Sequence, residues 1–313
     1  MDFKIPQTKY HGLINTVHLG DSRLPVGGQR SLYLHDFEGL NPYPPRFSLD
    51  VWDYDPADDW PAALLEVYQD VRHDPGLWAK KCVEYGADLV TLHLKSTSPN
   101  NQDLGADQAV KSVRRVLEEI EAPLIVMGVD HPDKDIEILS AVAEEFSGRN
   151  LAFGPVTARN YKRLGAQALA HGHSVIALSP TDFNLAKQLN ILLYGMGMPK
   201  DRIIMDPTAA ALGYGMEYCY TVMEQLQFAA LVVDDQDAQH PMISFFGEDV
   251  WRTKEAAQYV ENDSPSTSGQ ISRGIMLEAT DAISMIVAGA GILSMRHPEA
   301  LKVAQDFIRQ FEN

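Results

Sequence analysis

Residues 89–129 read LVTLHLKSTSPNNQDLGADQAVKSVRRVLEEIEAPLIVMGV, and this stretch contains a strand, a helix and a second strand in order. The two ends, Leu89–Lys95 and Leu124–Val129, are short apolar runs typical of strands that are covered on both faces. Between them, Asp103–Ala122 places Ala, Val, Leu and Ile side chains on one helical face and Lys, Arg and Glu on the other. The stretch therefore predicts one β–α unit of a parallel sheet.

The same alternation of strand and helix continues from residue 46 onwards. Glycines stand before the second, fourth and fifth predicted strands (Gly86, Gly148 and Gly172), where a helix often ends on a left-handed residue. Eight strands that alternate with helices favour a closed (β/α)8 TIM barrel. An open doubly wound sheet fits less well, because no phosphate-binding glycine fingerprint follows the first strand. The predicted strands are Phe47–Tyr54, Leu89–Lys95, Leu124–Val129, Leu151–Phe153, Val175–Leu178, Ile203–Met205, Met242–Phe246 and Ile292–Met295.

The first 45 residues differ from the repeating part and are predicted to form an N-terminal hairpin extension. Gly12–Gly20 and Ser31–His35 are strand-like runs, separated by the turn-rich Pro25–Gly28. The proline-rich segment 41–45 then breaks the chain before the barrel. We expect two parts, an extension at 1–45 and a TIM barrel at 46–313, with the hairpin placed as a plug in the open bottom of the barrel.

Composition limits the classes of function. The 313 residues carry a formal net charge of −17, and no Lys/Arg cluster suited to nucleic acid is found. No signal-like or membrane-spanning segment is expected, because the apolar stretch Gly274–Leu293 contains Glu278 and Asp281. Two cysteines cannot supply four thiolates to an iron–sulfur cluster, and their scarcity suits a reducing cytoplasm. We expect a cytoplasmic protein with no metal site of its own.

Polar residues that follow the predicted strands are the first candidates for a site, because barrel proteins work at the carboxyl ends of their strands. The selected residues are Asn101, Asp130, Ser179, Thr181 and Asp206, and Glu248 also follows a strand. Structural roles compete with this interpretation. Thr181 or Asp182 is a natural helix N-cap, and Asp103 and Asp133 have the position of caps or first-turn acids.

The most distinctive run is Met205–Gly215, MDPTAAALGYG, after the sixth predicted strand. Its small residues allow a broad, flat ligand to approach the backbone, and the two glycines can present Tyr214 from a tight turn. Thr208, Ala210, Gly213 and Tyr214 are therefore added to the cofactor-binding candidates. The alternative is a loop that packs only against its own helix at residues 216–228.

This run, continued by Glu217-Tyr218 and by a helix ending at Met223-Glu224, closely resembles the delta subunit of the carbon monoxide dehydrogenase/acetyl-CoA synthase complex. In bacteria, that subunit is the small subunit of the corrinoid iron–sulfur protein. Asp88–Asn100 and Pro123–Gly128 resemble the same family. The resemblance covers roughly residues 45 to 300 and agrees with the family in length.

The resemblance implies a non-catalytic subunit of a methyl carrier in the reductive acetyl-CoA (Wood–Ljungdahl) pathway of carbon fixation in an anaerobe. The implied cofactor is a corrinoid (cobalamin, with its cobalt) at the interface with a large subunit, which alone carries the [4Fe–4S] cluster. The implied partners are that large subunit, in a heterodimer, and methyltetrahydrofolate methyltransferase, acetyl-CoA synthase and a reductive activator of the corrinoid. In this family the barrel meets the corrin with its top face.

Two other functions remain open at this point. The family is similar in fold to pterin-binding methyltransferases, so the chain could be a stand-alone pterin- or folate-dependent methyltransferase. Asp130, Asn160 and Asp206 could then hydrogen-bond the pterin edge. A barrel that serves only as a scaffold, without contact to a cofactor, is the other alternative.

Overall fold

The computed structural model describes residues 6–311 except 36, 40, 208–214 and 258–267, and it contains the predicted barrel. Eight parallel strands close in the order β10-β3-β4-β5-β6-β7-β8-β9. The barrel strands are β3 (Arg46–Trp52), β4 (Leu89–His93), β5 (Leu124–Met127), β6 (Ala152–Val156), β7 (Ser174–Leu178), β8 (Ile203–Asp206), β9 (Met242–Ser244) and β10 (Ala290–Met295). The prediction of a (β/α)8 TIM barrel is therefore confirmed, with every predicted strand in place.

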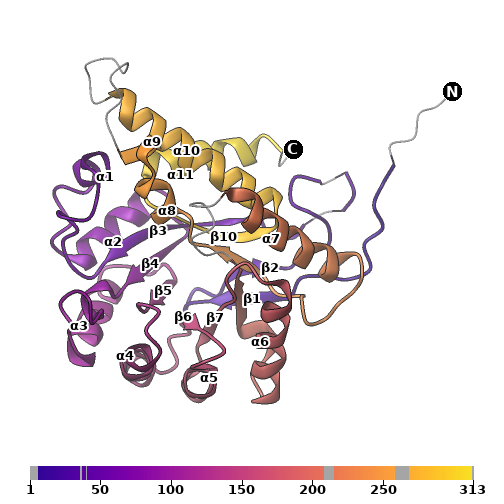
Figure 1. Ribbon diagram of the computed structural model, residues 1–313, viewed down its shortest axis with the longest axis horizontal. Helices are drawn as coiled ribbons and strands as arrows, with labels where there is room; N and C mark the ends of the chain where they lie inside the picture. The colour runs from indigo at the N-terminus through magenta and orange to yellow at the C-terminus, as the bar shows by residue number, and fades with distance from the viewer. Residues whose placement is uncertain (1–5, 36, 40, 208–214, 258–267, 312–313) are drawn as a thin grey trace.

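Helices surround the barrel (Figure 1). They are α1 (Ala62–Val67), α2 (Pro75–Glu84), α3 (Ala106–Leu117), α4 (Pro132–Glu145), α5 (Tyr161–His171), α6 (Phe183–Gly195), α7 (Met216–Leu231), α8 (Gly247–Arg252), α9 (Lys254–Ala257), α10 (Ser268–Val287) and α11 (Pro298–Arg309), with short 3₁₀ turns η1 (Lys95–Thr97) and η2 (Lys200–Arg202). Gly86, Gly148 and Gly172 follow helix ends with φ of 95°, 82° and 78°, which confirms their predicted left-handed conformation.

The predicted helix starts are confirmed with one exception. Asp182 caps α6 by accepting a hydrogen bond from the Leu185 amide at 2.9 Å, and Asp133 lies in the first turn of α4. The prediction for Asp103 was wrong, because α3 begins three residues later behind Gly105. Asp103 instead adopts φ 49° in the preceding loop and pairs with Lys134, 2.9 Å away.

The N-terminal hairpin exists, but its second strand lies earlier than predicted. β1 (Thr16–Leu19) pairs antiparallel with β2 (Leu24–Gly27), so the predicted turn at Pro25–Gly28 falls on a strand. The prediction of a strand at Ser31–His35 was wrong, because the chain already reverses at residues 20–23, where Gly20 has φ 67° and accepts a hydrogen bond from the Arg23 amide. A tight turn there brings the next four residues directly back against β1.

The hairpin closes the bottom of the barrel, as predicted. Its apolar side chains form one buried cluster with inward-facing residues near the amino ends of the strands. This cluster includes Val17, Leu19 and Val26 from the hairpin with Leu89, Ile125, Ala152, Ile204 and Ile243 from the barrel. The division into parts at residue 45 stays a prediction.

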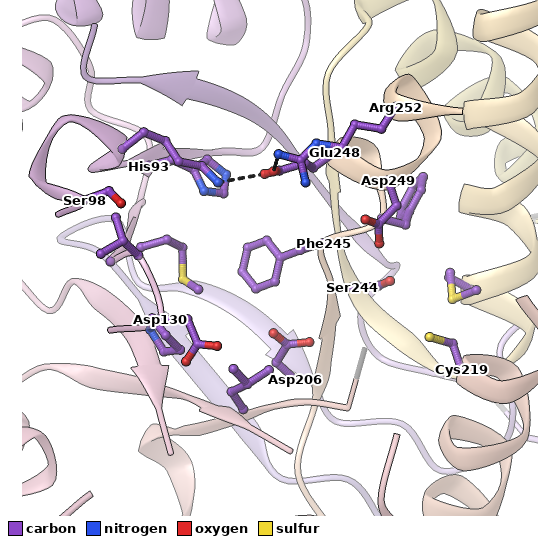
Figure 2. A pocket seen from close by; sticks show the side chains of 18 residues that line it. His93, Ser98, Asp130, Asp206, Cys219, Ser244, Phe245, Glu248, Asp249 and Arg252 are labelled. Atoms are coloured by element: carbon purple, nitrogen blue, oxygen red, sulfur yellow. Dashed lines mark hydrogen bonds and ion pairs between the residues drawn. The ribbon is translucent and has the colours of Figure 1, made fainter. Parts of the chain in front are cut away.

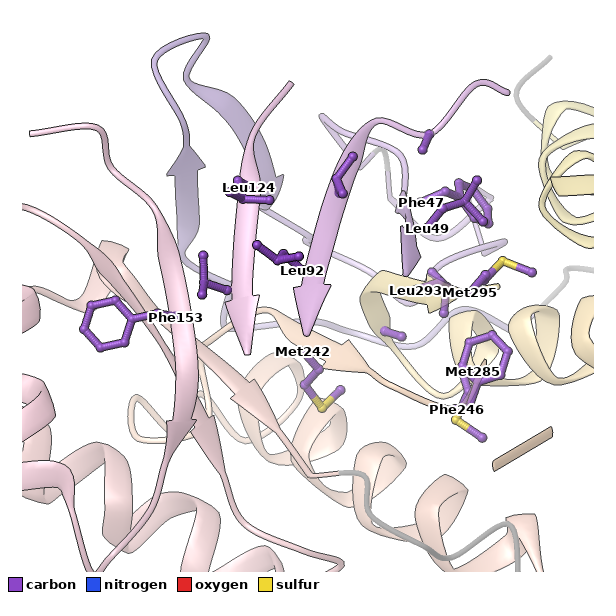
Figure 3. Packing of buried hydrophobic residues seen from close by; sticks show 14 of the residues in the cluster. Phe47, Leu49, Leu92, Leu124, Phe153, Met242, Phe246, Met285, Leu293 and Met295 are labelled. Atoms are coloured by element: carbon purple, nitrogen blue, oxygen red, sulfur yellow. The ribbon is translucent and has the colours of Figure 1, made fainter. Parts of the chain in front are cut away.

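A second and larger core lies between the strands and the helices (Figure 3). Along β3, Phe47, Leu49 and Val51 belong to this outer core, so the alternate residues Ser48 and Asp50 face the barrel interior. The same alternation on two adjacent strands turns further polar residues inward. The inward polar residues are Ser48, Asp50, Thr91, His93 and Ser294, joined by Arg296 just past β10, and all are buried. One side of the barrel interior is therefore polar.

Candidate functional site

A cavity of about 360 Å³ opens at the carboxyl ends of the strands (Figure 2). Five strands contribute their last residue to its wall: His93, Met127, Leu178, Asp206 and Ser244. Phe245, just past β9, adds an aromatic face, and α8 supplies carboxylates and an arginine. The hollow therefore lies on the end of the barrel where ligands bind in this fold.

Glu248, in the first turn of α8, is the centre of the charged side of the cavity (Figure 2). Its Oε2 lies 2.9 Å from Lys95 Nζ and 3.1 Å from the Arg296 guanidinium. Its Oε1 lies 2.6 Å from the Arg252 guanidinium. Burial alone would raise the pKa of Glu248, but Arg296 and Lys95 outweigh it and lower that pKa to about 2. Glu248 is thus an ionised carboxylate that fixes three cationic side chains.

Arg296 connects this carboxylate to a second one deeper in the barrel. Its Nε lies 3.3 Å from Asp50 Oδ2, and its guanidinium lies over the rings of Trp52 and Trp60, 5.5 and 4.8 Å from their centroids. His93 completes the group, with Nε2 3.2 Å from Asp50 Oδ1. The polar side of the cavity is therefore a network of alternating charges with little freedom to rearrange.

The opposite side of the cavity combines apolar walls with further carboxyl groups. Asp130 follows β5 with φ 57°, an unusual conformation for a non-glycine residue, and it is exposed at the rim. Burial raises the pKa of Asp130, and Arg159 partly opposes that rise. Asp249 of α8, beside Glu248 on the charged side, also has a raised pKa, through burial and then through Glu248. Carboxyl groups therefore stand on both sides of the cavity.

The structure brings together part of the predicted site. Asp130 and Asp206 line the cavity. Ser179 and Thr181 lie beside the end of β8, where their amides donate to the carbonyls of Asp206 and Pro207, both at 2.9 Å. The Ser179 hydroxyl is buried without a hydrogen-bond partner among the described residues, and Thr181 is exposed with φ 45°.

The remaining predicted residues are not gathered at the cavity. Asn101 lies on the exposed loop after β4, where its amide nitrogen is 3.3 Å from the Lys95 carbonyl, and it does not line the cavity. Thr208, Ala210, Gly213 and Tyr214 lie outside the described residues. Asp206, with its side chain 4% exposed, is the one member of the distinctive run whose position at the cavity is described.

The sequence analysis missed Asp50, His93 and Arg296, which form the buried part of the site. The pattern that could have found them is strand periodicity. In Arg46–Trp52, polar Ser48 and Asp50 alternate with apolar residues, and such alternation in a barrel strand means a polar interior. A prediction based only on apolar runs does not register this alternation.

Within the described part of the chain, no three His, Cys, Asp or Glu side chains are grouped so that they could hold a metal ion. The two cysteines, Cys82 and Cys219, are buried and form no disulfide with each other, and burial raises the pKa of Cys82 well above its ordinary value. Among the same residues, no helix combines the length and the apolar character needed to cross a membrane.

The fold and the cavity define a (β/α)8 barrel protein with a charged mouth. The family model for the CO dehydrogenase/acetyl-CoA synthase delta subunit matches residues 16–303. The acetyl-CoA decarbonylase/synthase complex subunit delta of Archaeoglobus fulgidus is 35% identical over 97% of this chain and 70% of that protein. Its counterpart in Methanothermobacter thermautotrophicus is 34% identical over 99% of this chain and 79% of that protein. The chain belongs to this delta-subunit family, as its sequence resemblance predicted.

Solved structures support the fold alone. Dihydropteroate synthase from Thermus thermophilus superposes with a TM-score of 0.56 at 15% identity, covering 95% of this chain and 98% of that one. The enzyme from Yersinia pestis, in a sulfonamide drug complex, gives a TM-score of 0.59 at 13% identity, over 87% of this chain and 95% of that one. At such identities the likeness is one of barrel architecture, and it does not transfer an activity.

Proposed function

We propose that this chain is the small subunit of a corrinoid iron–sulfur protein, and that the mouth of its barrel caps a corrinoid held by a large subunit. Its relatives are named as subunits of an acetyl-CoA decarbonylase/synthase complex. In this proposal the heterodimer carries methyl groups from a methyltetrahydrofolate methyltransferase to acetyl-CoA synthase, and a reductive activator restores the corrinoid. The large subunit carries the [4Fe–4S] cluster, since two cysteines cannot hold one.

The observation that carries the proposal is the match between the cavity and the chemistry of a corrin. A volume of about 360 Å³ is at the small end of ligand pockets, so the mouth can face a corrin but cannot enclose one. Phe245, Met127 and Leu178 offer an apolar surface to the ring. Asp130 and Asp206 offer acceptors to the N–H groups of its amide side chains. The apolar residues and the carboxylates of the cavity therefore fit a corrinoid.

A bound corrinoid supplies the cobalt centre that accepts and gives up the methyl group. The residues of this chain bind and orient the group and keep water out of the mouth. Glu248 holds Lys95 and Arg252 in place, so the charged wall keeps its shape when a second surface covers it. We therefore assign the chain a binding role, with no nucleophile of its own.

A stand-alone pterin-dependent methyltransferase is less well supported. That alternative needs Asp130, Asn160 and Asp206 to converge on one ligand. Asn160 is instead 2% exposed and does not line the cavity. Its Oδ1 accepts from the Thr157 amide at 2.7 Å, and its Nδ2 donates to the Pro155 carbonyl at 3.1 Å. Its polar atoms are occupied by the backbone before α5.

The proposal is tested by expressing the chain alone and together with its candidate large subunit, followed by cobalt, iron and sulfide analysis. We expect the pair to elute as one heterodimer that contains cobalt and iron, and the isolated chain to contain neither. Stoichiometric iron and sulfide in the isolated chain would contradict the assignment of roles. Tight binding of methyltetrahydrofolate by the isolated chain would favour the methyltransferase alternative.

A further inference from the structure

His93 occupies a position between a buried carboxylate and the cavity. It is the last residue of β4, faces inward and lines the cavity with 7% of its surface exposed. Phe245 packs against the imidazole in an edge-to-face arrangement, with centroids 6.2 Å apart. One side of the ring therefore faces the space that a ligand would fill, and the ring has little freedom to turn.

Asp50 lies behind His93, with a carboxylate oxygen close to a buried ring nitrogen that has no hydrogen-bond partner among the described residues. The distance from Asp50 Oδ1 to His93 Nε2 is 3.2 Å, and the Ser294 hydroxyl donates to the same oxygen at 2.6 Å. Burial would raise the pKa of Asp50, but its interactions with His93, Arg296 and Ser294 outweigh burial and keep that pKa below its ordinary value. Asp50 is therefore an ionised carboxylate, which can only accept hydrogen bonds.

The acceptor character of Asp50 fixes the chemistry of the neutral imidazole. Because Nε2 faces a carboxylate, the ring proton belongs on Nε2, and Nδ1 is left with a lone pair. The cations near His93 are held by other groups: Lys95 by Glu248, and Arg296 by Glu248 and Asp50. Among the described residues no hydrogen bond to Nδ1 is found, so an N–H or O–H donor of the ligand can fill this position.

We infer that His93, oriented by Asp50, is a specificity residue that accepts a hydrogen bond through Nδ1 from a donor on the ligand in the barrel mouth. This inference rests on the proposed function, in which the ligand is a corrinoid and the donors are its primary amides. Asp130, Asp206 and Asp249 in the same cavity also select N–H donors and repel carboxylates. Asp50 acts through His93 and is a positioning residue.

The first test needs no corrinoid. Long-range ¹H–¹⁵N correlation spectra of the histidine rings in the full chain distinguish the two neutral tautomers, and the His93→Phe spectrum identifies His93 among the ten histidines. We expect the proton of His93 on Nε2 in the parent and a mixture of tautomers in Asp50→Asn. A parent ring protonated on Nδ1 would overturn the inference, whether or not the protein binds a corrinoid.

The second test measures retention of cobalamin by the heterodimer, followed through its visible spectrum after dilution. We expect His93→Phe to release cobalamin about threefold to tenfold faster, which is the loss of one hydrogen bond. His93→Asn keeps an acceptor near the position of Nδ1 and should restore most of the retention. His171→Ala, at the opposite end of the barrel, is the matched control and should behave like the parent.

Cobalamin analogues with one amide hydrolysed to a carboxylate extend the second test. We expect at least one of them to be released from the parent heterodimer faster than cobalamin is. In His93→Phe the difference between the two release rates should be smaller. Equal release rates in the parent and in a folded His93→Phe heterodimer would overturn the ligand contact. A parent heterodimer that holds no cobalamin would instead refute the proposed function. The first test would still decide the tautomer of His93, because it needs no corrinoid.

Discussion

At the scale of single residues, Glu278 shows how a buried carboxyl group supports the site without touching the cavity. It lies in α10 and is fully buried. Its oxygens accept from the Trp251 indole at 2.9 Å and from the backbone amides of Arg296 and His297 at 2.5 and 3.0 Å. These bonds connect α10 to α8 and to the end of β10, so Glu278 helps to fix Arg296 beside Asp50.

Burial raises the pKa of Glu278 from 4.5 to about 7, although its three hydrogen bonds lower it. Between these two pH values the folded state binds a proton that the unfolded state has lost, so stability falls as pH rises. We predict that the free energy of unfolding of the parent, relative to Glu278→Gln, falls by about 3 kcal/mol between pH 4.5 and 7.5. Urea unfolding at several pH values measures this difference.

Glu121→Gln is the control for this experiment, since Glu121 is exposed after α3. Surface substitutions change stability by within about 0.5 kcal/mol, so its pH profile should follow that of the parent. A constant difference between the parent and Glu278→Gln over the whole range would mean that the carboxyl group does not titrate there.

The sequence predicted the rim of the site better than its interior. Asp130 follows β5 and Asp206 ends β8, and the fold alone places such residues at the mouth. His93 and Asp50 belong to strands that were predicted from their apolar residues, so single polar residues in them were not selected as site candidates. Their pairing with Arg296, some two hundred residues away, depends on β10 closing the barrel against β3, which no local pattern reveals.

At the scale of elements, the contact between α8 and α10 determines where Glu248 stands. Trp251 of α8 packs over Gly274 of α10, and a methyl group added at Gly274 would lie 2.4 Å from the indole ring. Glycine is therefore required at this position by close approach, because the buried ring has no space to move. The helix that carries Glu248, Asp249 and Arg252 is held by this contact and by Glu278.

We predict that Gly274→Ala destabilises the protein by about 1–3 kcal/mol, as overpacking of a filled core does. The displacement of α8 should also weaken the ion pairs of Glu248. The control is Gly195→Ala in α6, where an added methyl group meets nothing within 4 Å. That change should be neutral or stabilising by up to about 1 kcal/mol, because alanine favours helix. Thermal unfolding of both variants measures these effects. Equal melting temperatures of Gly274→Ala and Gly195→Ala would contradict the packing argument.

Element types were predicted reliably because hydrophobic periodicity repeats along the whole barrel, whereas turn positions were not. The hairpin shows the reason. Pro25–Gly28 has the composition of a turn, yet Leu24–Gly27 pairs with β1 because Val26 reaches the barrel interior. Burial of one side chain in the barrel outweighs local turn preference. The true turn at residues 20–23 has Gly20 as its marker.

At the scale of the whole molecule, the barrel is closed at one end and open at the other. The hairpin fills the amino ends of the strands with apolar side chains, and the polar interior leads to the cavity at the carboxyl ends. Because the hairpin packs against the inward-facing residues at the amino ends of the strands, these residues are held in place. The charged network of Asp50, His93, Arg296 and Glu248 above them can then keep its geometry. The hairpin then contributes to the site without being near it.

The last prediction tests whether the hairpin and the barrel unfold together. Val26 is fully buried against inward-facing barrel residues, so Val26→Ala should lower the free energy of unfolding by about 2 kcal/mol. Leu13→Ala, at a side chain that is 45% exposed, is the control and should change it by less than about 0.5 kcal/mol. If both parts share one core, urea transitions followed by tryptophan fluorescence and by far-ultraviolet circular dichroism coincide and shift together in Val26→Ala. Two separate transitions, with only the smaller one moved by the substitution, would show instead that residues 1–45 are an independent unit and that the barrel is stable without its plug.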